Sequence, residues 1–487
     1  MRLLLPLLTL ACRPPADDGK PTEGDDTART ADTADTADTA DTGLPPIARP
    51  GIAGLVDLGA RNIVFIHADT IRADHLPMYG YERDTLPRAS AYPWLVVDGA
   101  VSTSSWTIPS SVSVLTGLSV ARHGVTHMTT TGDMNADVAA PTVGGHLSEL
   151  GYHTFLYSGN EGLPGVDGAF NGFEEAQGRF ADGYSHDLQW LGRNALAWVD
   201  SLPDDDAPFF IWLQPMDTHG PYNPAPEHLG TWSDPEAPPF DLDASEDEQV
   251  TQFDANYRAA ETDEAREAVV QAARDVYDEL LLGFDDGLVA ILQGLEARGL
   301  ADDTLVVVTG DHGESIGEEL GGALGMSYGH GGKVRQELVR MPFLVHHPRL
   351  PPAEEPCVAS TIDVLPTLFL ATGVPTPRDT DGIPLQDGCR PYATSNAFVL
   401  DVDEPLLSEI MVTDGFSTLR WDCWHGDVQR YDLVTDPAGL VDLDASAFPA
   451  EEALTEAMEV ELAALRAGVG DLACTLTEDT DTDTATE

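Results

Sequence analysis

The chain has 487 residues, of which 42% are hydrophobic, and its 83 acidic residues against 25 Lys and Arg give a formal net charge of −58. Such a chain can bury a large core, as one big domain with a smaller appendage. Residues 1–44 hold nine acids and four bases, and residues 475–487 hold five acids and no base, so most of the charge belongs to the folded body. A surface this acidic repels polyanions, which excludes nucleic acid as an expected partner, and it favours cation binding.

The chain starts with a basic residue, a short apolar run and a small residue in front of Cys12. This pattern predicts a lipoprotein-type export signal over residues 1–12, although a chance match or a misplaced start codon remains the alternative. No other segment has the about 20 apolar residues that a membrane-spanning helix needs. We therefore expect an exported protein that meets the membrane only through a lipid anchor at Cys12, in the periplasm or at the cell surface.

Low-complexity sequence brackets the folded part. Residues 13–48 repeat Thr-Ala-Asp among Pro, Gly and acids, which predicts a disordered acidic linker, and residues 475–487 form a similar disordered tail. Between them we expect a main domain over residues 50–390 and a small C-terminal subdomain over residues 391–474.

The first folded element is a buried strand over Asn62–His67, followed by Asp69. Next, Ser104–Gly117 reads as a helix start, because Pro109 suits a first helical turn and Thr107 or Ile108 falls near the N-cap. A helix N-terminus favours anions, so an ester anion bound there would lie against the Thr107 oxygen. The alternative is that Thr107 only caps the helix.

The rest of the main domain alternates helices and strands. In chain order we expect a helix over Thr142–Gly151, a strand over Thr154–Tyr157, a helix over Asp187–Leu202, a strand over Phe209–Leu213, a long helix over Val269–Leu295 and a strand over Leu305–Val308. This alternation predicts an α/β fold with a mainly parallel sheet, helices on both faces and ligand groups at the carboxyl ends of the strands.

The C-terminal part follows a shorter pattern. Antiparallel strands are expected over Phe416–Trp421 and Gln429–Leu433, followed by a helix over Glu451–Ala467, which makes this subdomain α+β. Four cysteines besides Cys12 lie in the last third of the chain: Cys357, Cys389, Cys423 and Cys474. They lack the CxxC spacing of zinc or redox sites, so an exported protein could pair them in any of three ways.

Polar side chains follow two of the predicted strands. Asp69 comes after the first strand, and Asp311 and His312 follow the strand over Leu305–Val308. At one sheet edge with Thr107, these groups would hold one divalent cation with carboxylate, imidazole and hydroxyl ligands. The cation would lower the pKa of the Thr107 hydroxyl, which is otherwise a poor nucleophile near neutral pH.

Two loop histidines complete this predicted site. His219 follows the strand over Phe209–Leu213, and His330 lies among glycines that let the backbone approach a ligand closely. Either imidazole could hold an ester oxygen or protonate a leaving group.

The same segments resemble the sulfatase family within the alkaline phosphatase superfamily. The matching segments are Asn62–His75, Ser104–Gly124, Met216–Pro224, Thr309–Gly317, His330–Pro342, Ser360–Gly373, Asp381–Leu385 and Tyr431–Leu443. The resemblance implies an alkaline-phosphatase-like fold with a catalytic domain over residues 50–390. It also implies Asp69, Asp311, His312 and Thr107 around the metal, Thr107 in the nucleophile position, and His219 and His330 facing the ester.

The sequence departs from the family pattern at the nucleophile. Typical sulfatases carry Cys or Ser in a C-x-P-x-R motif and convert it to formylglycine, whereas this chain has Thr107 there and Ser111 in place of the arginine. Thr70 replaces a second acid, and Ser158-Gly159-Asn160 stands where the family has a Lys-x-His pair. A Thr nucleophile is instead similar to that of the phosphotransferase and phosphodiesterase relatives.

We therefore expect an exported, metal-dependent sulfatase-like hydrolase or transferase of sulfate or phosphate esters that works through Thr107 without formylglycine. Asn160 and Lys333 are predicted to bind the substrate, a small-molecule, glycan or lipid ester. The metal is Ca, Mn or Zn, which the ligand types do not distinguish. The alternative is a catalytically inactive cell-surface binding protein that keeps the fold.

Overall fold

The computed structural model describes residues 50–131, 133–160, 162–178, 187–318, 328–399, 402–448, 450–470 and 472. All of them belong to one compact unit, Pro45–Glu487. The predicted signal with Cys12, the linker over 13–48, the tail over 475–487 and Cys474 lie outside the described residues. The domain boundaries remain predictions. None of the described helices combines the length and apolarity needed to cross a membrane.

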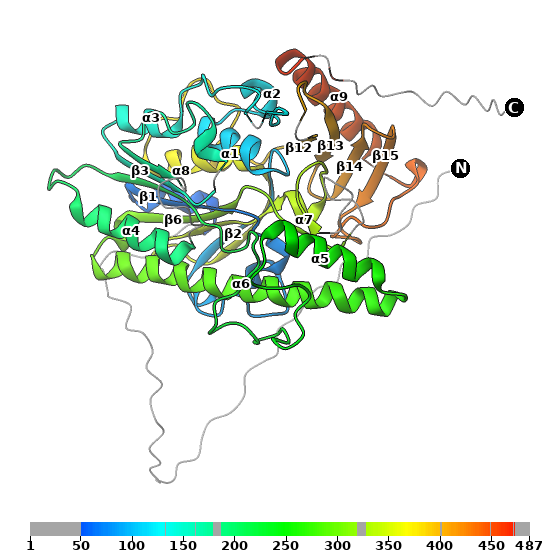
Figure 1. Cartoon of the computed structure of the whole chain (residues 1–487). Coiled ribbons are helices and arrows are strands. Elements are labelled where there is room, and N and C mark those ends of the chain that lie inside the picture. Colours follow the sequence, from blue (N-terminus) through cyan, green and yellow to red (C-terminus); the bar gives the residue numbers. More distant parts are fainter. Residues whose placement is uncertain are drawn as a thin grey trace, which may run out of the picture. The chain divides into compact units, whose positions relative to one another are not determined.

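A nine-stranded mixed sheet organises the unit, in the order β11-β2-β10-β6-β1-β5-β3-β4 with β9 paired to β2 (Figure 1). Its strands are β1 (Asn62–Ala68), β2 (Trp94–Val101), β3 (His153–Ser158), β4 (Glu175–Gly178), β5 (Phe209–Gln214), β6 (Thr304–Gly310), β9 (Arg340–Met341), β10 (Phe343–His346) and β11 (Ala353–Ser360). Five neighbouring pairs are parallel, and β9 and β10 run antiparallel to their neighbours. The mainly parallel sheet predicted from the sequence is confirmed.

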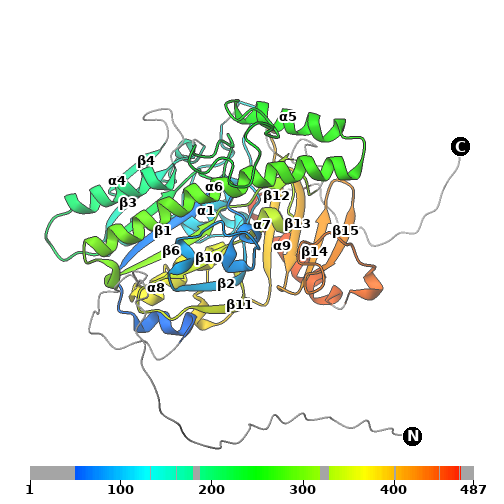
Figure 2. The ribbon, with the colours of Figure 1, turned by 90° about the horizontal axis from the view of Figure 1, so that it is seen from below.

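Helices cover both faces of the sheet (Figure 2). Each face has its own apolar core. One core includes side chains of α1 (Thr107–Thr116), α3 (Val143–Glu149) and α8 (Val364–Thr372). The other includes α4 (Leu188–Ser201) and the long α6 (Asp263–Ala297), with α5 (Glu246–Ala259) beside it. Because β1, β5 and β6 are buried along their whole length, these strands read as continuous apolar runs rather than alternating ones.

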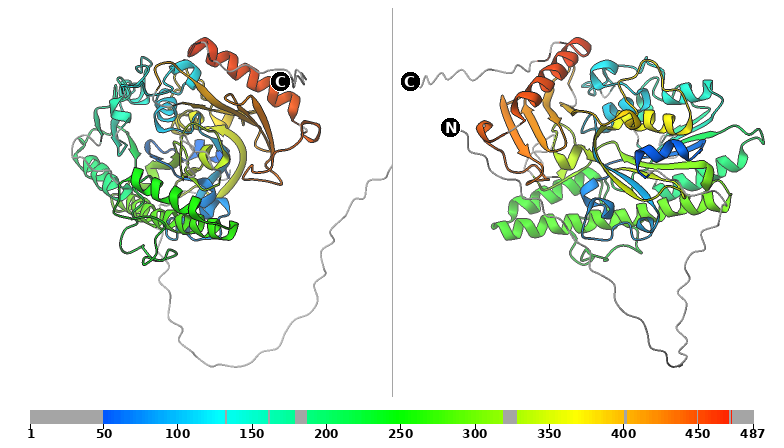
Figure 3. Two further views of the ribbon diagram at one scale, coloured as in Figure 1. Left: turned by 45° about the vertical axis from the view of Figure 1, so that its right-hand side comes forward. Right: turned by 180° about the vertical axis from the view of Figure 1, so that it is seen from behind.

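The C-terminal part adds a four-stranded antiparallel sheet with one helix against it (Figure 3). Its elements are β12 (Ala393–Phe398), β13 (Leu407–Thr413), β14 (Ser417–Asp422), β15 (Asp427–Asp432) and α9 (Glu451–Gly468). Two short helices, α2 (Val120–His123) and α7 (Gln336–Val339), and the small ladder of β7 (Ser315–Ile316) and β8 (Tyr328–Gly329) complete the described elements of regular structure apart from 3₁₀ turns. The sequence anticipated β14, β15 and α9 but not β12 and β13.

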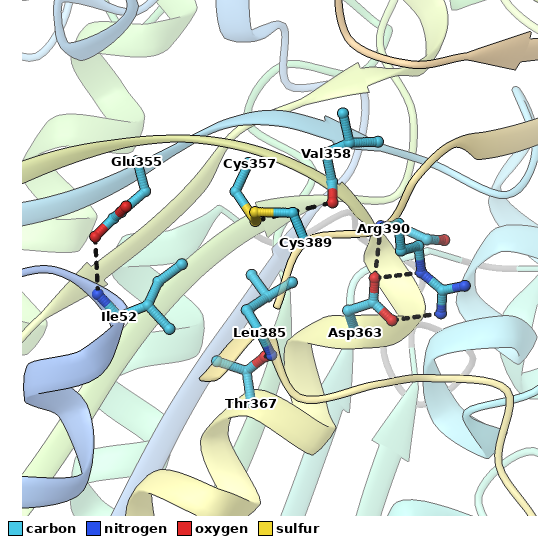
Figure 4. Close-up of a disulfide and its surroundings, with 10 residues drawn as sticks. Ile52, Glu355, Cys357, Val358, Asp363, Thr367, Leu385, Cys389 and Arg390 are labelled. Carbon is cyan, nitrogen blue, oxygen red and sulfur yellow. Dashed lines mark hydrogen bonds and ion pairs between the residues drawn. A yellow bond between two sulfur atoms is a disulfide. The ribbon is translucent and has the colours of Figure 1, made fainter. Parts of the chain in front are cut away.

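A disulfide ties the segment that connects the two sheets to the main sheet (Figure 4). It joins Cys357 of β11 to Cys389, 32 residues later and shortly before β12. Beside it, both carboxylate oxygens of Asp363 accept hydrogen bonds from Arg390, at 2.5 and 2.6 Å. Of the pairings that the cysteine count left open, the structure therefore contains Cys357–Cys389.

Close packing of α6 on α4 depends on Gly287. A Cβ atom at this position would lie 2.6 Å from the Gln189 backbone nitrogen and 2.7 Å from Leu188 Cβ, whereas a Cβ at Gly283 would meet nothing closer than 3.9 Å. We predict that Gly287→Ala lowers the free energy of unfolding by about 1–3 kcal/mol through overpacking. Gly283→Ala should instead raise it by about 0.5–1 kcal/mol, because alanine favours the helix. Urea denaturation of both variants measures the difference, and equal effects would contradict this packing argument.

Candidate active site

Two parallel strands bring acidic side chains to one edge of the sheet. β1 pairs with β6 in a register that sets Ala68 opposite Gly310, so both strands end at the same level. Asp69 follows β1, while Asp311 and His312 follow β6, and all three side chains are fully buried. One ligand atom from each lies within 4.8 Å of the other two. The structure therefore brings together the three side chains that the sequence proposed as metal ligands.

The donor chemistry of this cluster fits a divalent cation. Asp69 Oδ1 is buried and has no hydrogen-bond partner in the described part of the chain. Burial, together with the charge of Asp69, holds the pKa of Asp311 well above its usual range. Two carboxylates buried side by side repel each other, and a cation between them removes that repulsion. Oxygen and imidazole ligands suit several divalent metals, so the donor set does not single out one ion.

His312 is oriented to offer an unprotonated nitrogen to this cluster. Its Nδ1 donates to the Gly313 carbonyl oxygen at 2.8 Å, which leaves Nε2 as the atom with the lone pair. That Nε2 lies 3.6 Å from Asp69 Oδ1 and 3.7 Å from Asp311 Oδ2. Burial, followed by the positive charge of His330, holds the pKa of His312 well below its usual range. The neutral imidazole is the form that coordinates metals.

Thr107 is the first residue of α1, and its hydroxyl faces the acidic cluster. The Oγ1 atom lies 3.0 Å from His312 Nε2 and 3.5 Å from Asp69 Oδ2, and the residue is only 2% exposed. The N-cap of α1 is Trp106, which makes no side-chain cap hydrogen bond. The expectation that Thr107 or Ile108 falls near the N-cap is therefore confirmed, whereas the alternative that Thr107 only caps the helix is wrong. Because the extended residue Trp106 takes the N-cap position, Thr107 is the first helical residue, and its hydroxyl is not used to cap the helix.

Two buried amides brace the carboxylates. Asn160 Nδ2 donates to Asp69 Oδ2 at 2.9 Å, so the side chain that we predicted to bind substrate holds a predicted metal ligand in this structure. Gln214, at the end of β5, places Nε2 3.5 Å from Asp311 Oδ2 and 3.4 Å from Ser111 Oγ. The sequence analysis missed Gln214, although a polar residue closing the apolar run of β5 was an available signal.

His219 and His330 face each other beside the cluster. Their ring centroids are 5.3 Å apart, and the His330 ring lies 4.3 Å from that of His312. In His219, Nδ1 lies 2.9 Å from the Gly220 carbonyl oxygen and 3.7 Å from Glu246 Oε2. Both histidines predicted from the sequence thus lie at the site.

Glu314 is a second residue that the sequence analysis missed. It is fully buried, and its Oε1 lies 3.0 Å from His330 Nδ1 while Oε2 accepts the Tyr222 hydroxyl at 2.7 Å. Burial of His330 opposes its protonation, but the Glu314 charge prevails and raises the pKa of His330 to about 9. Its position two residues after His312, inside the motif that we singled out, was the signal.

Lys333 follows His330 by three residues and is half-buried. The chain has two lysines, Lys20 and Lys333, so this is the one ammonium group among the described side chains. It forms no ion pair with a described residue, although Glu409 and His425 lie within electrostatic range. The predicted substrate-binding lysine is therefore available to an anion.

A sequence model of the family described as Sulfatase matches residues 61–374 of this chain. The chain belongs to the sulfatase family. Over 354 residues it is 27% identical to human arylsulfatase A, which is 68% of each chain. A shorter match, 43% identical over 84 residues, covers 17% of this chain and 20% of the low-salt glycan biosynthesis sulfotransferase Agl7 of Haloferax volcanii. The chain thus spans about a fifth of that relative's length.

Solved structures share the fold. One, determined in complex with its substrate D-glucosamine-2-N,6-O-disulfate, has a TM-score of 0.66 at 17% identity and covers 84% of this chain and 98% of its own. The phosphonate monoester hydrolase of Agrobacterium radiobacter has a TM-score of 0.62 at 17% identity, covering 84% of this chain and 95% of its own. The sulfatase family and its neighbours in the alkaline phosphatase superfamily are sulfate or phosphonate ester hydrolases or sulfotransferase-like enzymes.

The charge repulsion in the cluster makes a prediction about stability. Asp311→Asn should raise the unfolding free energy of the metal-free protein by on the order of 1–2 kcal/mol, because one of two adjacent buried charges is removed while the backbone N–H of His312 keeps an oxygen acceptor. The same change should abolish the stabilisation that Mn²⁺ or Ca²⁺ gives the native protein, about 2.7 kcal/mol at a hundred times its Kd.

Denaturation in EDTA and in excess metal measures both effects. The exposed Glu82→Gln variant, which removes an equal charge elsewhere, serves as the control. If the metal stabilised the Asp311→Asn protein as much as the native one, Asp311 would not be a ligand.

Proposed function

We propose that the protein is a metal-dependent hydrolase or transferase of sulfate or phosphate esters that uses Thr107 as its nucleophile. The observation that carries this proposal is the position of the Thr107 hydroxyl, 3.0 Å from His312 Nε2 and 3.5 Å from Asp69 Oδ2 at the start of α1. A buried hydroxyl aimed at carboxylates and an imidazole has no role in capping its helix. It does have the setting that an activated nucleophile requires.

The site's own residues account for the steps. A divalent cation held by Asp69, Asp311 and His312 would lower the pKa of the Thr107 hydroxyl and neutralise charge on the ester. The Thr107 hydroxyl loses its proton to solvent as it ionises. Attack then forms a bond from Oγ1 to sulfur or phosphorus and breaks the bond to the leaving-group oxygen, which takes a proton from His219 or His330. A second step then cleaves the threonine ester and restores the hydroxyl. The enzyme is a hydrolase if water carries out this step and a transferase if an acceptor alcohol does.

Three local features would hold the anionic ester. The first-turn N–H groups of α1 point toward the site of attack, where the helix dipole favours negative charge. The imidazoles of His219 and His330 supply nearby cationic groups, and Lys333, three residues after His330 in the sequence, is the candidate for a further one. Asn160 and Gln214 keep the carboxylates apart from the substrate by hydrogen bonding to them. The cation would neutralise what these two hydrogen bonds leave unpaired, above all Asp69 Oδ1.

The chemistry proposed does not use formylglycine. Thr107 carries a methyl group on the carbon that would have to become an aldehyde, and Ser111 stands where the family arginine would brace that aldehyde. We therefore favour phosphoester chemistry, with sulfate esters as the competing substrates. The substrate class is a small-molecule, glycan or lipid ester, in line with the sulfated glucosamine bound by one structural neighbour.

A substrate panel tests the nucleophile. Thr107→Ala should lower kcat by at least about a thousandfold on whichever aryl sulfate, phosphate monoester, phosphodiester or phosphonate the native enzyme turns over. Thr107→Ser should keep part of the rate because the attacking oxygen remains. Thr372→Ala at the end of α8, whose hydroxyl bonds to Leu368, Phe369 and Tyr152 and to no residue of the site, is the control and should act like the native enzyme.

Mass spectrometry of the native enzyme quenched during turnover should detect a phosphoryl or sulfonyl group on the peptide that contains Thr107. Equal turnover by the native and Thr107→Ala proteins would rule out the nucleophile. Absence of any turnover by the metal-loaded native protein on the whole panel would favour the inactive binding protein.

We also propose that the protein is exported and lipid-anchored at Cys12. The support is the pattern of residues 1–12 and the acidic linker that separates them from the folded unit. The full-length protein should partition with membranes and release into the soluble fraction in the Cys12→Ser variant, because one diacylated cysteine supplies most of the membrane affinity. A native protein that stays soluble and keeps Met1 would contradict the anchor.

A further inference from the structure

A cavity lies away from the catalytic groups. Its volume is about 150 Å³, and neither Thr107 nor His219 nor His330 lines it. Charged side chains form most of its wall: Arg72, Asp74, Glu318, Glu337 and Arg340. The loop after β15 contributes Pro437, Ala438 and Leu440 as an apolar side.

The two arginines in this wall are already neutralised. Arg72 is only 3% exposed, and its Nε and Nη2 donate to the two carboxylate oxygens of Asp74 at 3.0 and 2.7 Å. Its Nη1 donates to Glu318 at 2.7 Å. Arg340 pairs with Asp98 at 2.6 Å. Neither guanidinium therefore offers an unused charge to an anion in the cavity.

Glu337 is the one carboxyl group of the cavity wall that forms no ion pair with a described residue. It is 8% exposed, whereas Asp74 and Glu318 both pair with Arg72. Burial and the neighbouring charge of Glu318 raise the pKa of Glu337 to about 8, although the charges of Arg72 and Arg335 act in the opposite direction. Near neutral pH this carboxyl group is therefore mostly protonated, and a cation in the cavity would stabilise its ionised form.

We propose that this cavity binds an organic cation, an ammonium or guanidinium group on a short apolar stem. The cationic group would pair with Glu337, and the stem would pack on Pro437 and Leu440. A bare metal ion fits less well, because the one described cluster that brings three metal-ligating groups within 4.8 Å is Asp69, Asp311 and His312.

The size and the field of the cavity agree with this class of ligand. The cavity volume of about 150 Å³ is well above the roughly 10–15 Å³ that one water molecule needs on the same measure, so a small organic cation has room there. The net charge of −58 concentrates cations around the whole molecule, which raises the rate of their encounter with the cavity. Selectivity then has to come from the buried carboxylate and the apolar side.

The cavity lies directly behind the loop that carries the catalytic groups. Arg72 Nη1 donates to the Glu314 carbonyl oxygen at 2.9 Å, and Gly313 N donates to the Leu338 carbonyl oxygen at 2.8 Å. A Cβ atom at Gly313 would come within 1.9 Å of the Glu337 carbonyl oxygen. The residue that would hold the cation thus touches the backbone between His312 and Glu314.

Calorimetric titration of the full chain with n-butylammonium and with 1,4-diaminobutane, at fixed ionic strength, tests the proposal. The native protein should bind one equivalent saturably. Glu337→Gln, which keeps the shape but not the charge, should bind at least about tenfold more weakly. Ala438→Leu, which fills the cavity and leaves every charge in place, should do the same. The exposed Glu149→Gln variant removes an equal charge elsewhere and should bind like the native protein.

Thermal melts of each variant confirm that it is folded before titration. Equal amine binding by all four proteins would mean that the amine is attracted only by the overall charge of the protein, and it would contradict the proposed site. So would saturable binding of Mn²⁺ or Ca²⁺ that depends on Glu337 and that butylammonium does not displace, or the absence of any saturable amine binding.

Discussion

Two carboxylates buried side by side, those of Asp69 and Asp311, are the constraint on which the rest of the site depends. They meet because β1 and β6 are parallel, adjacent and in register at Ala68 and Gly310. A parallel sheet covered on both faces ends its strands in a region with little water, so neither charge can be solvated. Several polar groups around them therefore donate to a carboxylate oxygen, among them Asn160 and Gln214, while His312 offers a lone pair to the same centre.

The donors to these carboxylates come from several distant segments of the chain. Asn160 follows β3 and Gln214 ends β5, so the four central strands β6, β1, β5 and β3 all send a polar group to the same edge. The backbone N–H groups of Thr70 and His312 donate to Asp311 as well, at 3.3 and 2.7 Å. Because each donor depends on the strand order, the site forms only when the sheet is complete. The fold and the site are one structure in this sense.

The sequence could predict those parts of the fold that depend on periodicity. The strand at Asn62, the long helix α6 and the helix α9 all have apolar patterns that tertiary packing reinforces, and each was found within a few residues. β12 and β13 were missed because polar residues such as Asn396 and Glu409 interrupt their apolar positions. Those residues are buried in the structure, with Glu409 held by Arg335 at 3.0 Å and Asn396 by Glu461 at 3.0 Å, so long-range pairing replaces the local signal.

The residues of the candidate site that could be predicted directly follow a strand. Those that position another side chain of the site could not be recognised in the same way. Asp69, Asp311 and His312 could be placed because the ends of parallel strands share an edge. Glu314 and Gln214 were missed although both lie next to predicted features, because spacing along the chain does not show which of them contacts His330 or Asp311. The role of Thr107 depends on the backbone of Trp106, which is extended and takes the N-cap position, so that Thr107 is the first helical residue. A one-residue shift at a helix start separates a capping hydroxyl from one that faces a reacting group.

The strongly negative charge of the chain opposes the binding of an anionic ester, and groups close to Thr107 have to overcome this repulsion. An anionic ester approaching a molecule of net charge −58 is repelled at long range, and salt screens that repulsion beyond about 10 Å. Attraction must then come from groups within a few ångströms of the substrate, and the N-terminus of α1, His219 and His330 are the groups that lie beside Thr107 and the metal cluster. Buried groups are screened much less than the surface acids. The surface can therefore be strongly acidic while the one site that has to take an anion stays locally positive once its carboxylates are neutralised.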